Sequence, residues 1–112
     1  MSDADDLAAE LAALATEYRA KLAGRLDSLD ACAAELPAGP ARTARLADLR
    51  RELHPLAGSA RTFGLPAVSA AARDAERFLD PWCDAQATPG AADWEALRAL
   101  LAALRQAAGA GA

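Results

Sequence analysis

Lysine is nearly absent from this 112-residue chain, and neither a basic tract nor a long apolar run is present. Lys21 is the only lysine, the remaining cations are arginines, and the formal net charge is −4. Because nucleic-acid-binding proteins carry clustered basic residues, we do not expect a nucleic-acid partner. The apolar runs are short and broken by charged residues, so no stretch is expected to cross a membrane.

Cysteine and histidine are too few and too dispersed for a metal site. The chain has two cysteines, Cys32 and Cys83, and one histidine, His54. Metal sites of this kind need several such ligands at short spacings, so we expect none here. Both thiols are expected to be reduced and packed as small apolar side chains. The first six residues include three aspartates and no basic side chain, whereas a signal peptide starts basic, which favours a cytoplasmic location.

Alanine and leucine are abundant, and they determine the expected fold class. The chain is 54% hydrophobic but only 4% aromatic. Alanine and leucine are the best apolar helix formers, and β-branched residues are scarce. The length suffices for one domain with a core but not for two. We therefore expect one all-α domain over residues 1–112, with a frayed tail at about 109–112.

Apolar residues recur every three or four positions in four segments that proline and glycine separate. We expect helices over about 3–36, 42–63, 66 to between 79 and 82, and 93–108, with links at 37–41, 64–65 and 84–92. Gly64 is placed to end the second helix in a left-handed conformation. The inward stripe of the first helix is Leu7, Leu11, Leu14, Tyr18, Leu22, Leu26, Leu29, Ala33 and Leu36. Four such helices predict an antiparallel up-down four-helix bundle.

His54 lies in the second segment, on the side that faces solvent. At 100° per residue it points roughly 130° away from the apolar stripe 49–60. Arg50, Arg61 and Gly58 are its expected neighbours on that face. A glycine inside a helix costs about 1 kcal/mol relative to alanine, so Gly58 suggests that another molecule approaches closely. A neutral imidazole is a competent nucleophile, although an exposed histidine can also be a plain surface residue.

The segment that begins at His54 resembles the signature of histidine-containing phosphotransfer domains. It reads His54-Pro55-Leu56-Ala57-Gly58-Ser59-Ala60-Arg61-Thr62-Phe63-Gly64-Leu65. The family pattern is His-x-Leu-(Lys or Ala)-Gly and two small residues, followed by a hydrophobic residue and Gly. The resemblance implies a four-helix bundle in which His54 is phosphorylated and Gly58 is the small residue beside it.

By this resemblance the chain is a phosphocarrier, without kinase activity of its own. His54 would accept a phosphoryl group from a receiver-domain aspartate and pass it to another receiver in two-component signalling. The partner would be the receiver of a response regulator or of a hybrid histidine kinase. That receiver would supply Mg²⁺, so this chain needs no cofactor, and we expect a monomer.

Two groups of residues are expected to surround the phosphorylated histidine. Arg50, Gly58 and Arg61 would form the neighbourhood of the phosphoryl group, where cations favour its charge. The surface that a partner covers is expected to include Ala47, Arg51, Ala57, Arg73 and Glu76.

Pro55 and Ala57 keep a second interpretation open. Many family members carry lysine at the position of Ala57, where it can meet the phosphoryl group. A proline inside a helix removes a backbone hydrogen bond and costs about 3 kcal/mol or more. The alternative function is a helical module that binds a receiver or a kinase without being phosphorylated. A generic helical adaptor is a third interpretation, which leaves the signature around His54 unexplained.

Overall fold

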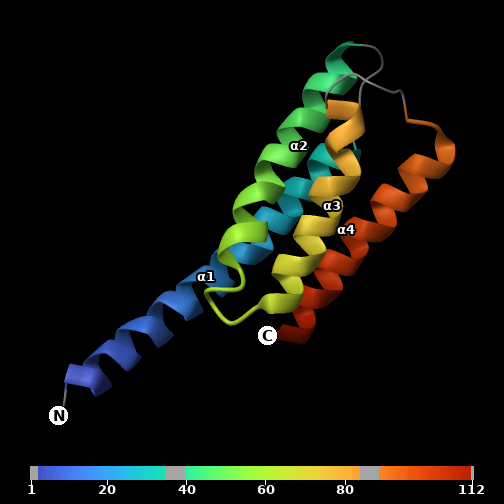
Figure 1. Ribbon diagram of the computed structural model, residues 1–112. Helices are drawn as coiled ribbons and strands as arrows, with labels where there is room; N and C mark the ends of the chain where they lie inside the picture. Colours follow the sequence, from blue (N-terminus) through green and yellow to red (C-terminus); the bar gives the residue numbers. More distant parts are fainter. Residues whose placement is uncertain (1–2, 35–39, 84–88, 112) are drawn as a thin grey trace.

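Four α-helices form the protein in the computed structural model, which describes residues 3–34, 40–83 and 89–111 (Figure 1). The helices are α1 (Asp3–Ala34), α2 (Pro40–Ser59), α3 (Pro66–Cys83) and α4 (Ala91–Gly111). They alternate in direction, and no strand occurs in the described ranges, which confirms the predicted up-down bundle. None of the helices in these ranges combines the length and the apolar content that crossing a membrane requires.

Leucine and alanine build the core, as their spacing predicts. Leu46, Leu49, Leu53 and Leu56 of α2 are each at most 1% exposed. They pack against α3, which lies against both α2 and α4. Burying one leucine side chain contributes about 1.5–3 kcal/mol, so these stripes are the main stabilising feature of the bundle. The other helices contribute Leu22, Leu26, Leu29, Val68, Ala72, Ala75, Leu79, Trp82, Leu97, Leu101 and Leu104.

The turn between α2 and α3 is a left-handed cap at Gly64. Gly64 has a φ of 81°, the Leu65 N–H donates to the Ala60 carbonyl at 2.9 Å, and the Gly64 N–H donates to the Arg61 carbonyl at 3.1 Å. This pair of bonds is the Schellman motif, which satisfies the last carbonyls of a helix. The regular helix ends at Ser59, four residues before the expected end, because the tighter turns of this cap occupy residues 60–64.

The other helix ends differ from expectation by a few residues. α4 begins at Ala91 because the Asp93 carboxylate accepts the Gly90 N–H at 2.8 Å and so caps the first turn. α2 begins at Pro40, where proline suits a first helical turn. Residues 35–36 at the expected end of the first helix, and residues 37–39 and 84–88 of the expected links, lie outside the described residues.

The C-terminal tail is helical for longer than expected. α4 continues to Gly111, so residues 109–111 of the tail expected to fray are part of the helix. Ala107 and Ala108 pack against the core at this point, which favours continuation of the helix. Residue 112 lies outside the described residues.

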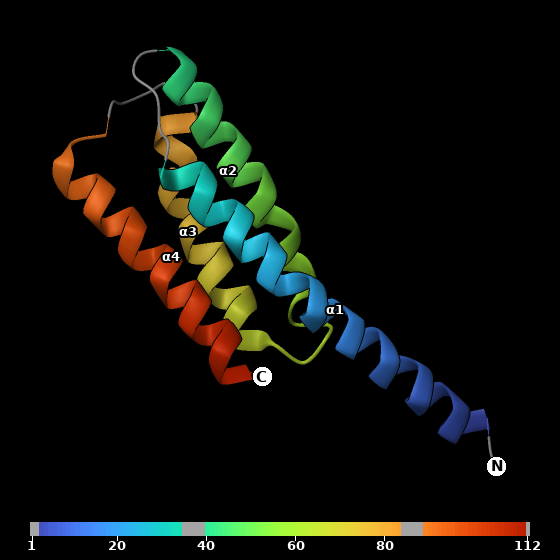
Figure 2. The ribbon, with the colours of Figure 1, turned by 180° about the vertical axis from the view of Figure 1, so that it is seen from behind.

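The N-terminal half of α1 extends past the bundle, and the prediction that its whole stripe faces inward is wrong (Figures 1 and 2). α1 has 32 residues and α2 has 20, which makes them about 48 Å and 30 Å long. Leu7, Leu11 and Leu14 are 50–57% exposed. The bundle ends at Tyr18, whose ring stacks on Phe63 of the α2–α3 turn at 4.6 Å between centroids. We call residues 3–17 the α1 overhang.

Candidate functional site

His54 is exposed on α2 and is held by a carboxylate of α3. Its side chain is 78% exposed, and its Nδ1 atom lies 2.5 Å from Oε2 of Glu76. The neighbouring Leu53 and Leu56 are buried in the core. The predicted position of His54 on the solvent side of a core helix is therefore confirmed.

The short turn at Gly64–Leu65 brings these two residues together. His54 and Glu76 each lie eleven residues from Leu65, and Arg50 and Asp80 each lie fifteen. Arg50 Nη1 donates to Asp80 Oδ1 at 3.1 Å, so this second pair also meets across the two helices. In an antiparallel helical hairpin, residues equally distant from the turn lie opposite each other. The turn thus sets which residue of α3 meets the histidine.

The contact with Glu76 determines the state of the imidazole ring. A carboxylate accepts hydrogen bonds, so the proton of the neutral ring lies on Nδ1. In this tautomer Nε2 carries the lone pair, which is available to an incoming group. The Glu76 side chain is 20% exposed and is thus positioned more firmly than the ring it binds. This arrangement suits a nucleophilic nitrogen, with a carboxylate that stabilises the positive charge which the ring acquires.

Gly58 leaves open space one turn after His54. A Cβ atom built at this position would meet nothing within 4 Å. Its φ is not positive, so the backbone does not require glycine either. Nothing in the described part of this chain explains the choice of glycine, and an approaching partner molecule would explain it.

The two arginines predicted beside the imidazole lie in different elements. Arg50 bonds to Asp80 on α3, and Arg61 lies in the turn after α2. Because the regular helix ends at Ser59, helical spacing does not place Arg61 on the face of His54. The partner of the imidazole is Glu76, which sequence reasoning had assigned only to the docking surface. Counting outward from the predicted turn at residues 64–65 would have identified it.

Four other residues were predicted to lie on the surface that a partner covers, and for one of them this prediction is wrong. Ala57 is only 5% exposed because it packs against α3, where its carbonyl accepts the Ser69 hydroxyl at 2.5 Å. Arg73 Nη2 also reaches this carbonyl at 3.5 Å. Ala47 is half-buried and Arg51, bonded to Asp48 at 2.9 Å, is exposed. Ala57 therefore cannot offer its side chain to a partner, whereas the other three positions are accessible.

Ser59 fastens the end of α2 to α1. Its hydroxyl donates to the Pro55 carbonyl at 2.7 Å and lies 2.9 Å from the Tyr18 hydroxyl. Because the Ser59 proton is used toward Pro55, Tyr18 is the donor of the second bond. The segment that carries His54 is thus anchored on both sides, by α3 and by α1.

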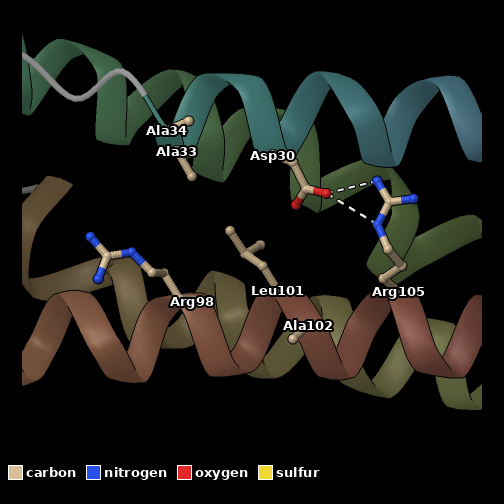
Figure 3. A pocket seen from close by; sticks show the side chains of 7 residues that line it. All are labelled: Asp30, Ala33, Ala34, Arg98, Leu101, Ala102 and Arg105. Carbon is tan, nitrogen blue, oxygen red and sulfur yellow. Dashed lines mark hydrogen bonds and ion pairs between the residues drawn. The ribbon is translucent and has the colours of Figure 1, made fainter.

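A groove elsewhere in the molecule does not include His54. It lies between α1 and α4, has a volume of about 330 Å³, and contains the ion pair between Arg105 and Asp30 at 2.7 Å (Figure 3). Its lining residues, all from these two helices, are Asp30, Ala33, Ala34, Arg98, Leu101, Ala102 and Arg105. In the part of the chain that the structure describes, no three His, Cys, Asp or Glu side chains gather as metal ligands.

A comparison with known families identifies the chain. The model of the Hpt domain family matches residues 3–107, which include all of α1, α2 and α3 and most of α4. No curated protein and no solved structure matches the chain.

Proposed function

The chain belongs to the Hpt domain family, whose members carry out histidine phosphotransfer in phosphorelay signalling, and from this premise we propose that His54 is the phosphorylated residue. It accepts a phosphoryl group from a receiver-domain aspartate and transfers it to another receiver. The observation that carries the proposal is an imidazole that is 78% exposed and whose Nδ1 is bound by Glu76, which leaves Nε2 as the nitrogen for reaction.

In the proposed reaction, Nε2 of His54 attacks the phosphorus of an aspartyl phosphate. The new N–P bond forms as the O–P bond breaks, and the aspartate leaves as a carboxylate. The ring then carries a positive charge, which the Glu76 carboxylate stabilises through the Nδ1 proton. Transfer to a second receiver is the reverse of this step.

The receiver supplies the remaining chemistry. Phosphoryl transfer needs positioning and cations around the moving group rather than covalent help from the carrier. We propose that Mg²⁺ is bound by the receiver and that this chain holds no cofactor and acts as a carrier without kinase activity.

The docking surface of the receiver is proposed to lie over the exposed face of α2 and the neighbouring edge of α3. Gly58 allows a loop of the receiver to approach His54 closely. Ala47, Arg51 and Arg73 border this face, and Arg50 and Arg61 add positive charge that favours a phosphorylated aspartate.

The test is incubation of the chain with a receiver that carries labelled aspartyl phosphate. The wild type should become labelled, and the label should be lost in acid and kept in base, as expected for a phosphoramidate. His54→Gln should take up no label, whereas Ser59→Ala should still be labelled. Acid-stable label, or label on His54→Gln, would show that another residue is modified.

A second candidate function is a receiver-binding module that is not phosphorylated. The observation that favours it is Ala57, which occupies the position of the common family lysine and is buried. If the chain binds a receiver, takes no phosphate from it, and binds equally well as His54→Gln, this second function replaces the first.

A further inference from the structure

The α1 overhang carries an apolar stripe that the chain itself does not cover. Leu7, Leu11 and Leu14 are 57%, 56% and 50% exposed. With Tyr18 they are spaced four, three and four residues apart, which is the spacing of a coiled-coil seam. Contiguous exposed apolar residues of this kind usually mark a contact with another molecule.

We propose that two copies of this chain pair through their α1 overhangs in antiparallel orientation. In this arrangement Leu11 of one chain faces the partner's Leu14, and Leu14 faces the partner's Leu11. The same stripe serves both chains, as a two-fold interface requires. The expectation of a monomer is thereby replaced by an equilibrium between monomer and dimer.

The charges along α1 favour the antiparallel orientation. Residues 3–14 contain four acidic residues and no cation, whereas Arg19, Lys21 and Arg25 follow in the next turns. Parallel pairing would place the two acidic segments side by side. Antiparallel pairing places each acidic segment against the partner's cations, and it also opposes the two helix dipoles.

A groove lies at the base of the overhang, close to where the first turn of a second chain would end. It has a volume of about 260 Å³ and lies between α1 and the end of α4. Leu22, Leu26 and Ala108 give it an apolar lining, and Arg19 and Arg105 lie at its edge.

The register set by the two leucine pairs brings the acidic first turn to the edge of this groove. When Leu11 faces the partner's Leu14, Leu7 lies opposite the partner's Tyr18, and Asp6 lies opposite the partner's Arg19. The acidic first turn therefore approaches the edge of the groove at the partner's Arg19. The complementarity at this end is one of charge, between the carboxylates of the first turn and that arginine.

The size of the contact predicts a weak dimer. The overhang has 15 residues, which make a helix about 22 Å long. Two such segments bury less than the 1,200 Å² or so that stable specific interfaces bury. We therefore expect dimerisation to depend on concentration and to leave the exposed face around His54 free.

Sedimentation velocity on the full chain tests the proposal over about 10 µM to 1 mM, the range of weak association. The mass of the wild type should rise from 11.5 kDa toward twice that value. Leu11→Asp/Leu14→Asp should remain monomeric throughout. Ala9→Asp/Thr16→Asp adds the same two charges on the opposite face of the overhang and should dimerise like the wild type.

The orientation is tested by Asp3→Arg/Asp6→Arg. Antiparallel pairing predicts dimerisation weakened by more than about fivefold, because in both chains attraction to the partner's cations becomes repulsion. Parallel pairing predicts tighter association, because repulsion between the acidic turns would be relieved.

Three other results would overturn the proposal. One is a wild-type mass that stays at 11.5 kDa over the whole range. Another is equal loss of dimer in Leu11→Asp/Leu14→Asp, the stripe variant, and in its control Ala9→Asp/Thr16→Asp. The third is a stripe variant that keeps the wild-type mass but loses phosphoryl transfer, since the stripe would then bind the receiver. Label uptake at His54 is measured separately, so failure of the dimer leaves the proposed function intact.

Discussion

The α2–α3 hairpin and the α1 overhang are both built on leucines spaced by three and four residues, yet only one of them is covered. In the hairpin, Leu49 and Leu53 are fully buried, and polar pairs cross between the helices on the outside. In the overhang, Leu11 is 56% exposed. The difference shows that periodicity specifies a helix with an apolar face, whereas the length of the neighbouring elements decides whether that face is covered.

The largest difference in stability between the hairpin and the overhang is expected when one leucine of each is replaced by alanine. Leu53→Ala should lower the free energy of unfolding by about 2–5 kcal/mol, because it opens a cavity in the core. Leu11→Ala should change it by less than about 0.5 kcal/mol. Urea unfolding at low protein concentration, where the chain is monomeric, measures both. Similar losses in the two variants would mean that the overhang packs on the bundle.

Gly58→Leu should separate stability from phosphoryl transfer in the hairpin. Transfer from a receiver should fall by roughly 5- to 150-fold, the effect of about 1–3 kcal/mol of steric conflict at a packed contact. Stability should rise by about 0.5–1 kcal/mol, because leucine is a better helix former and the position is open.

Gly24→Leu is the matched control for this change. A Cβ at Gly24 also meets nothing within 4 Å, but the residue lies on α1. The control should gain similar stability and keep full transfer. Unchanged transfer by Gly58→Leu would show that the receiver binds elsewhere.

Glu76→Ala should slow phosphoryl transfer by roughly tenfold, the effect of a charge-assisted hydrogen bond of about 1.5 kcal/mol at a partly exposed site. Its folding should be nearly unchanged, because the carboxylate binds an exposed ring. Single-turnover label transfer from a phosphorylated receiver measures the effect. Asp80→Ala, which removes the neighbouring carboxylate bound to Arg50, is the control and should not slow transfer. Equal rates for the wild type and Glu76→Ala would exclude a positioning role.

The smallest effect is expected where the two regions meet. Tyr18→Phe removes the hydroxyl that donates to Ser59, and it should cost about 1 kcal/mol of stability. Thermal unfolding should detect this change, and phosphoryl transfer should stay within about twofold of the wild type. The control Thr16→Val removes a hydroxyl bonded only to its own helix at Ala12 and should have less effect.

The sequence predicted the number of helices, the buried stripe of α2, the left-handed Gly64 and the exposure of His54, since each depends on residues close in the chain. It did not predict the contact with Glu76, because that depends on how two helices align. Burial of Ala57 was missed for a related reason. Ala57 lies at the edge of the α2 stripe, and only the packing of α3 decides that it is covered. Exposure of Leu7 was missed because a helical pattern does not show where the neighbouring helices end.

The residues of α2 and α3 that contact each other lie equally far from Leu65 along the chain, so the register between the two helices is counted from this turn. One residue inserted into α3 between the turn and Glu76 would rotate this carboxylate by about 100° about the helix axis and shift it by about 1.5 Å along the axis. Glu76 would then point away from the histidine, although no residue of the site had changed. The number of residues between the turn and each contact therefore decides which side chain meets His54, and counting outward from the turn locates that side chain.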